Sequence, residues 1–181
     1  MVSQLELKLI KMQTSHYYKK RDGLAKQVNF HGKTFFDKFE RVDSAISPPI
    51  LNEHFAKKIT IAHDLILPEN MVENIVFDFN GADRERFYHR AQLMLREEGF
   101  LNFTAYESGS SGHLHLYVHK GHTTLGEGCQ LAKALSAKLV QKMTRQWRVF
   151  PTFDLPPEFN ILTIPYGVYA KERGSGWSKH M

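Results

Sequence analysis

The chain has 181 residues, of which 42% are hydrophobic and 24% charged, and this size and composition predict one compact domain with a sizeable core. Its 13 Phe, 7 Tyr and 2 Trp exclude a disordered chain, and no apolar run approaches the roughly 20 residues that a membrane span requires. The net charge of +5 lies in residues 1–58, which hold 11 Lys or Arg against 6 Asp or Glu, so a basic N-terminal third is expected to attract phosphate.

The cysteine count and the first residues indicate the compartment. Cys129 is the single cysteine, which excludes a disulfide framework and a Cys-rich zinc site, and we expect it to be inert packing. The apolar stretch at the N-terminus is interrupted by charges, which is not typical of a signal peptide. We therefore expect a cytoplasmic protein that does not associate with membranes.

Residues 1–70 predict a small α/β unit. The basic cluster Tyr17–Gly23 ends in Gly and predicts an exposed bend. His31-Gly32 lies between two apolar stretches and predicts the turn of a hairpin. Ser47-Pro48-Pro49 predicts the beginning of a helix, and the β-branched segment 58–67 predicts a strand.

Residues 75–80 alternate between apolar and polar side chains. This pattern predicts a strand that buries an aromatic face and places Asp78 and Asn80 on the opposite face. Asp83 then predicts the N-cap of a helix that Gly99 terminates.

A second strand pair follows. Residues 100–107 predict a strand, and Ser108–Gly112 predict a turn. The next segment, HLHLYVHK, alternates strictly, so its leucines and valine share one face. The opposite face is expected to carry His113, His115, Tyr117 and His119.

The last third predicts a helix and two closing strands. Thr124 and Glu127 form a capping pair before a helix whose leucine stripe belongs to the core. Residues 148–154 and 160–166 predict strands. From residue 73 the order is therefore β-α-β-β-α-β with one further strand.

This order predicts an α+β fold with a ferredoxin-like antiparallel sheet and both helices on one face. A basic α/β unit, residues 1–70, is expected to pack on the βαββαβ core, residues 71–181, as a single compact domain overall. Because the helices occupy one face, the other is expected to be free to hold a site. There Asp78 and Asp154 suit Mg²⁺ or Mn²⁺ and in-line nucleotidyl transfer, and the turn from Ser108 to Gly112 can cradle a triphosphate.

Three segments resemble motifs of the archaeo-eukaryotic primase (prim-pol) superfamily. SGSSGHLHLYV (108–118) resembles a motif with Ser-Gly, two variable residues, Gly and then a His in an apolar strand. IVFDFN (75–80) resembles the paired acids at the end of a strand, and FDLPPEFNILTIPYGVY (153–169) resembles the third motif. The resemblance covers about residues 73–170 and implies a small, divergent prim-pol-like protein.

The resemblance also implies roles for individual residues. Catalysis would rest on Asp78, Asp154 and His115; Mg²⁺ or Mn²⁺ would be held by Asp78, Asp154 and Asn80; nucleotide would contact Ser108, Gly109, Ser110, Gly112, His115 and Lys120. Asn80 stands where the family usually has a second acid, which implies weaker metal binding. His113 is an alternative to His115 as the family histidine. The implied partners are nucleotides and single-stranded or primed nucleic acid, held by the basic N-terminal third.

Two other functions remain open from the residues alone. A non-catalytic nucleic-acid-binding module could have the same topology. The pair His113 and His115 also resembles the metal-binding histidines of relaxase-like single-strand endonucleases, in which Tyr17 or Tyr18 would attack the DNA phosphate. Alternatively, the histidines form a solvated sheet face.

Overall fold

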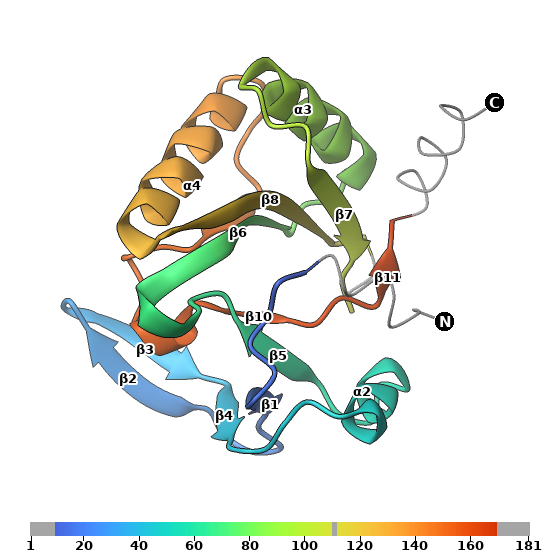
Figure 1. Cartoon of the computed structure of the whole chain (residues 1–181), viewed down its shortest axis with the longest axis vertical. Helices are drawn as coiled ribbons and strands as arrows, with labels where there is room; N and C mark the ends of the chain where they lie inside the picture. Colours follow the sequence, from blue (N-terminus) through green and yellow to red (C-terminus); the bar gives the residue numbers. More distant parts are fainter. Residues whose placement is uncertain (1–9, 110–111, 170–181) are drawn as a thin grey trace.

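The structure is a computed structural model that describes residues 10–109 and 112–169, and its architecture is α+β with antiparallel sheets, as the sequence predicts (Figure 1). A five-stranded central sheet carries two helices on one face and a four-stranded sheet on the other. Within these described residues, no helix combines the length and apolar character needed to cross a membrane.

In the central sheet every neighbouring pair of strands is antiparallel. In spatial order the strands are β11 (Gly167–Val168), β7 (Phe103–Glu107), β8 (Leu114–Thr124), β6 (Met71–Phe79) and β9 (Trp147–Phe150). Along the chain the elements follow the order β6-α3-β7-β8-α4-β9, which matches the predicted succession of helices and strands. As a result β6 lies between β8 and β9, and this position brings side chains from three strands together at one end of the sheet.

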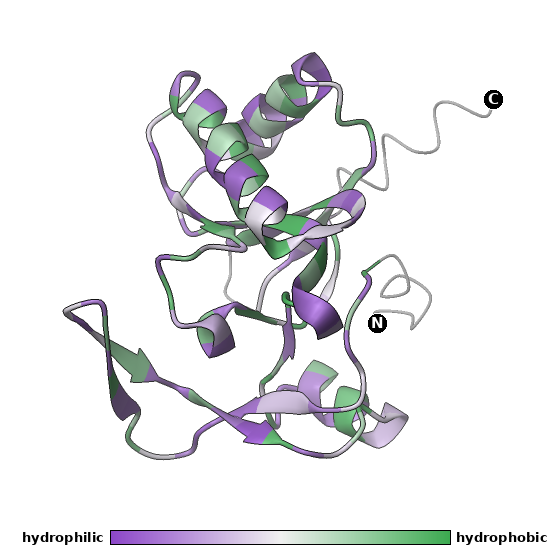
Figure 2. Ribbon diagram, turned by 60° about the vertical axis from the view of Figure 1, so that its left-hand side comes forward, coloured by the Kyte–Doolittle hydropathy of each residue, from purple (hydrophilic) through white to green (hydrophobic). Residues whose placement is uncertain are grey.

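The predicted alternation in β6 and β8 is confirmed. The helices on the upper face in Figure 1 are α3 (Arg84–Glu97) and α4 (Leu125–Val140). A first hydrophobic core fills the space between these helices and the central sheet. It includes Phe77 and Phe79 of β6, Leu116 of β8, and Leu135 and Leu139 of α4. Both helices mix hydrophobic and hydrophilic residues around their circumference, as Figure 2 shows, because only one stripe of each helix is buried.

The opposite face of the central sheet is not free, contrary to the prediction. A second sheet covers it, in the order β10 (Ile161–Thr163), β5 (Ile61–Asp64), β1 (Tyr17–Lys20) and β4 (Phe39–Val42). Val76 and Tyr117 point away from the helices into a second core, where they meet Ile61 and Leu162. Most of this face of the central sheet is thus buried in the second core. A ligand can reach it only at the edge where the two sheets diverge.

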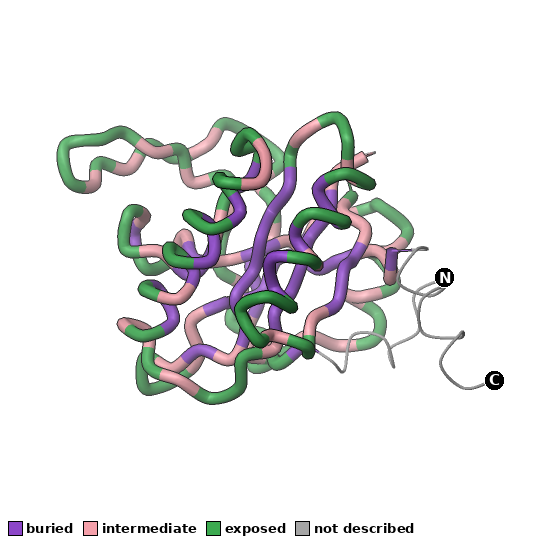
Figure 3. The backbone as a smooth tube through the Cα atoms, turned by 90° about the horizontal axis from the view of Figure 1, so that it is seen from above, coloured by how far each residue is buried: buried purple, intermediate pink, exposed green. Residues whose placement is uncertain are grey.

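The hairpin predicted at His31-Gly32 is present and stands apart from both sheets (Figures 1 and 3). It consists of β2 (Lys26–Phe30) and β3 (Lys33–Asp37), whose residues are all exposed or half-buried. His31 and Gly32 have φ values of 46° and 74°, as a two-residue turn with left-handed backbone requires. Among the described residues, the other helical segments are α2 (Pro48–Phe55), where the sequence predicts a helix, and the short 3-10 helices η1 (Pro68–Asn70) and η2 (Pro157–Phe159).

The exposed bend expected at Tyr17–Gly23 is wrong in its first half. Tyr17 to Lys20 form β1, which pairs with β4 on one side and β5 on the other. Both tyrosines are buried, since this interior position in the sheet places them in contact with neighbouring layers. The local sequence is rich in charge, but long-range strand pairing decides its conformation.

Candidate functional site

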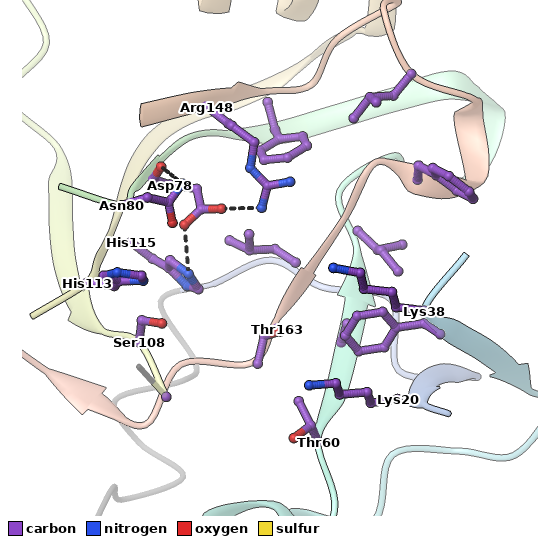
Figure 4. Close-up of a pocket in the computed structure, with 18 of the residues that line it drawn as sticks. Lys20, Lys38, Thr60, Asp78, Asn80, Ser108, His113, His115, Arg148 and Thr163 are labelled. Carbon is purple, nitrogen blue, oxygen red and sulfur yellow. Dashed lines mark hydrogen bonds and ion pairs between the residues drawn. The ribbon is translucent and has the colours of Figure 1, made fainter. Parts of the chain in front are cut away.

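Asp78 is the centre of a polar cluster that the strand register creates. On β6 it lies opposite His115 of β8 and opposite Arg148 of β9. The carboxylate Oδ1 is 3.3 Å from His115 Nε2, and Oδ2 is 2.6 Å from an Arg148 guanidinium nitrogen (Figure 4). Cross-strand neighbours on one face of a sheet are close enough for such pairs to form directly.

The surroundings of Asp78 determine its charge state. Burial of its carboxyl acts to raise its pKa, but the hydrogen bonds and charges of His115 and Arg148 outweigh burial and hold the pKa of Asp78 below its usual value. Asp78 is therefore an anion that is already paired with two nitrogen groups. Asp78 and His115 are each only 4% exposed.

The side chains of Asp78 and Asn80 do not fit as ligands of the Mg²⁺ or Mn²⁺ that the prim-pol resemblance implies. Both carboxylate oxygens of Asp78 contact nitrogen groups, and the Asn80 side-chain amide donates to the Asp78 backbone carbonyl at 3.2 Å. A hard divalent cation needs several free oxygen ligands. Across the described ranges, no group of three or more His, Cys, Asp or Glu side chains could hold a metal ion.

Asp154 lies apart from this cluster. Pro151 follows β9 directly, so the strand ends at Phe150 and Asp154 falls in an exposed turn. Burial, together with the charge of Asp154, raises the pKa of the Cys129 thiol to about 11, so Asp154 acts on helix α4. Cys129 itself is buried, as expected. Asp154 does not line the cavity described next.

A cavity of about 810 Å³ opens where the two sheets and the hairpin meet. Its volume is within the range of small-molecule sites. One wall carries the residues predicted from the sequence: Asp78, Asn80, Ser108, Gly109, His113 and His115. The two histidines therefore reach the same cavity, as their spacing in the strand predicts.

The other predicted nucleotide contacts are not all in the cavity. Gly112 has a φ of 80° and ends the turn before β8, while Lys120 is exposed farther along β8; neither lines the cavity. Ser110 is outside the described residues. Gly109 lies so close to the Tyr166 ring that a Cβ atom would stand 2.7 Å from it, so this part of the turn needs glycine.

The wall opposite Asp78 is basic. It is formed by the β2-β3 hairpin and by the four-stranded sheet of β10, β5, β1 and β4, called the N-terminal sheet below. Figure 4 shows the side chains of Lys20 and Lys38 pointing into the cavity toward the Asp78 cluster. Neither ammonium group has an acidic partner in the part of the chain that the structure describes. Sequence reasoning noted the basic excess of this region but did not single out these two lysines.

Arg148 is the third cation that sequence reasoning missed. The predicted order of helices and strands assigns residue 148 no partner, and only the pairing of β9 with β6 in the structure places Arg148 opposite Asp78. The other acid that lines the cavity, Asp37, is 3.4 Å from Arg21. Both cavity acids are thus paired with arginines, and the three lysines that line the cavity, Lys20, Lys38 and Lys57, give it a positive surplus.

Of the remaining polar residues on this face, Tyr117 is buried and His119 is half-buried. His119 bonds to Asn74 and Thr104, each at 3.1 Å, and burial lowers its pKa. The Tyr117 hydroxyl bonds to His63 of β5 at 2.9 Å. On this face His119 therefore bonds to neutral side chains rather than to an acid, which differs from the interpretation as a solvated histidine ladder paired with acids.

The tyrosines proposed as relaxase nucleophiles lie away from the cavity. Tyr17 and Tyr18 are buried, and neither lines it. Burial, with the charge and hydrogen bond of Asp64, raises the pKa of Tyr18 to about 12. A phenol in this setting does not ionise easily enough to favour nucleophilic attack.

Comparison with known proteins gives a match in the N-terminal part. A family described as a domain of unknown function, DUF1882, matches residues 2–74. The matched segment includes β1 to β5 and thus Lys20 and Lys38 of the cavity. No curated protein matched the chain.

Proposed function

We propose that this chain is a nucleotide- or nucleic-acid-handling protein whose cavity binds the phosphate groups of its ligand. The observation that carries the proposal is the pair of lysines, Lys20 and Lys38, that point into the cavity without acidic partners among the described residues. Lysine ammonium groups bind phosphate as mobile point charges, and a partly enclosed cavity strengthens that attraction. Arg148 and His113 on the opposite wall add further donors.

The arrangement of the core supports a prim-pol-like relationship for this function. Four strands in the order β7-β8-β6-β9, with both helices on one face, are compatible with a ferredoxin-like core. Each of the three segments that resemble prim-pol motifs contributes residues to the cavity, namely Asp78, His115 and Tyr166 among others. The proposal assigns binding to this cavity and no metal-dependent transfer, because Asp78 is paired with Arg148 and Asp154 lies elsewhere.

The test compares phosphate binding by the native protein and by a variant that lacks both lysines. We expect Lys20→Ala/Lys38→Ala to bind inorganic tripolyphosphate and ATP at least about tenfold more weakly, since a hydrogen bond to a charged group contributes roughly 1.5–3 kcal/mol. Isothermal titration calorimetry at low salt measures both affinities. A parallel titration with short single-stranded DNA and RNA shows whether free nucleotides or strands are preferred.

A matched control removes the same charge from the other side of the molecule. Lys133→Ala/Lys138→Ala changes two exposed lysines of α4, the helix that packs on the opposite face of the central sheet. Affinity should be retained in this control. Equal losses in the two double variants would show a general charge effect and reject the cavity as the site, as would a native protein that binds neither tripolyphosphate nor ATP.

A further inference from the structure

One aromatic ring at the cavity is exposed in a way that core packing does not explain. Six large apolar side chains are exposed in the described parts of the chain: Leu24, Phe36, Leu93, Leu101, Val140 and Phe153. Of these six, Phe36 alone lines the cavity. Phe36 is 59% exposed. An exposed aromatic ring costs hydration free energy that a stacking partner would recover.

The hairpin that carries Phe36 is held in place at the cavity end. Phe35, the preceding residue, packs edge-on against Phe159 with ring centroids 6.1 Å apart. The Asp37 carboxylate accepts from the Phe39 backbone amide at 3.2 Å and pairs with Arg21. Phe36 therefore lies between two residues that make contacts outside the hairpin, and these contacts fix the backbone that carries its ring.

Phe36 is also close in the chain to the proposed phosphate contact. Lys38 follows two residues later, a spacing of about 7 Å in extended chain, and both residues line the cavity. A nucleotide has the same two features at a similar separation, a flat aromatic base and a charged phosphate group. A phosphate ligand without a base would leave the Phe36 ring without a partner.

We propose that Phe36 is a stacking platform for the base of a nucleotide whose phosphates bind near Lys38 and Lys20. This inference rests on the proposed phosphate-binding function and specifies its ligand class. Stacking on a phenyl ring requires only a π-face, so the site accepts any of the common bases and discriminates against ligands that have phosphate alone. Figure 1 shows the hairpin extending away from the two sheets, and a strand of several nucleotides could continue along it.

The experiment measures how much the base contributes to binding, with and without the ring. We expect Phe36→Ala to weaken ATP binding by about 5-fold to 100-fold, the range for loss of one base stack, and to leave tripolyphosphate binding unchanged. Phe36→Trp should restore ATP affinity, whereas Phe36→Leu, which keeps apolar area but has no π-face, should not.

Phe153→Ala is the matched control, because Phe153 is 61% exposed and does not line the cavity. ATP affinity should be unaffected in this variant. The stacking inference is overturned if Phe36→Ala binds ATP as the native protein does, or if it weakens ATP and tripolyphosphate equally. In either case the phosphate site stands, provided that tripolyphosphate binding still depends on Lys20 and Lys38. If the native protein binds neither ligand, both proposals fail.

Discussion

At the scale of single residues, the Asp78 carboxylate sets the charge of the cavity. It holds Arg148 at 2.6 Å, and this pairing neutralises one of the cations on that wall. It also provides an acceptor for the buried His115 Nε2 atom. The contact with Arg148 thus reduces the attraction of the cavity for phosphate, whereas the contact with His115 stabilises the fold by satisfying a buried polar group.

Substitution Asp78→Asn separates these effects. We expect the free energy of unfolding to fall by about 1–3 kcal/mol, because a neutral amide is a poorer partner for the buried imidazole. We expect tripolyphosphate to bind more tightly, because Arg148 is released and a negative charge is lost. Urea denaturation and calorimetric titration measure the two quantities.

Arg148→Ala serves as the comparison for Asp78→Asn. The Arg148 side chain is 63% exposed, so its removal should change stability less and should weaken phosphate binding. The assignment of Asp78 would be contradicted by an Asp78→Asn protein that binds phosphate more weakly than the native one.

At the scale of helices and strands, the pattern of apolar and polar residues predicts which face of a strand each side chain occupies, because neighbouring residues determine that direction. The alternation in residues 75–80 and 113–119 correctly assigns the faces of β6 and β8, because a period of two fixes side-chain direction. It thereby brings Asp78, His113 and His115 to one cavity. Strand partners are not local, and so the burial of Tyr17 in β1 and the meeting of Asp78 with Arg148 depend on pairings that residue patterns alone do not specify.

Helix α4 offers a matched pair of glycines for testing its packing on β6. A Cβ atom at Gly128 would stand 2.5 Å from a methyl carbon of the buried Val72, whereas one at Gly126 would meet nothing within 4 Å. We expect Gly128→Ala to lower the free energy of unfolding by about 1–3 kcal/mol, since the stiff Val side chain must shift.

Gly126→Ala should instead raise the unfolding free energy by about 0.5 kcal/mol, because alanine restricts the unfolded chain and favours helix. Thermal and urea denaturation of the two variants provide the comparison. Similar effects of both substitutions would show that α4 does not approach β6 as closely as the structure has it.

At the scale of the whole molecule, the central sheet is buried on both faces, and polar groups are enclosed between the two sheets. His63 of β5 is fully buried there and donates to or accepts from the Tyr117 hydroxyl of β8 across the interface. Burial lowers the pKa of His63 to about 4. The sequence predicts that this face of the central sheet is open. It does not predict the second sheet that covers the face, because that sheet combines N-terminal strands with β10 from the C-terminal part of the chain.

The buried His63 makes stability depend on pH. In the unfolded chain its imidazole binds a proton near pH 6.5, whereas in the folded protein it remains neutral down to about pH 4. The stability of the native protein should thus be complete above pH 6.5 and decrease as the pH falls to 4. His63→Gln should reduce that slope by up to about 1.4 kcal/mol per pH unit, as measured by urea denaturation.

Two features make this comparison specific. Burial also lowers the pKa values of His54 and His119, so part of the slope should remain in the variant. Tyr117→Phe, which removes the hydroxyl but leaves His63 buried, should keep the native slope. Parallel pH profiles for His63→Gln and the native protein would rule out His63 as a source of the dependence.

The place of β10 in the N-terminal sheet affects how the protein can fold. Residues 161–163 pair with residues 62–64, so an edge of β5 stays unpaired until almost all of the described chain has been synthesised. Closing such a long loop is slow, and an open strand edge is prone to pair with other molecules. Three strands of this sheet, β1, β4 and β5, precede the central sheet in the chain, yet the sheet is complete only after β9, when β10 has been made.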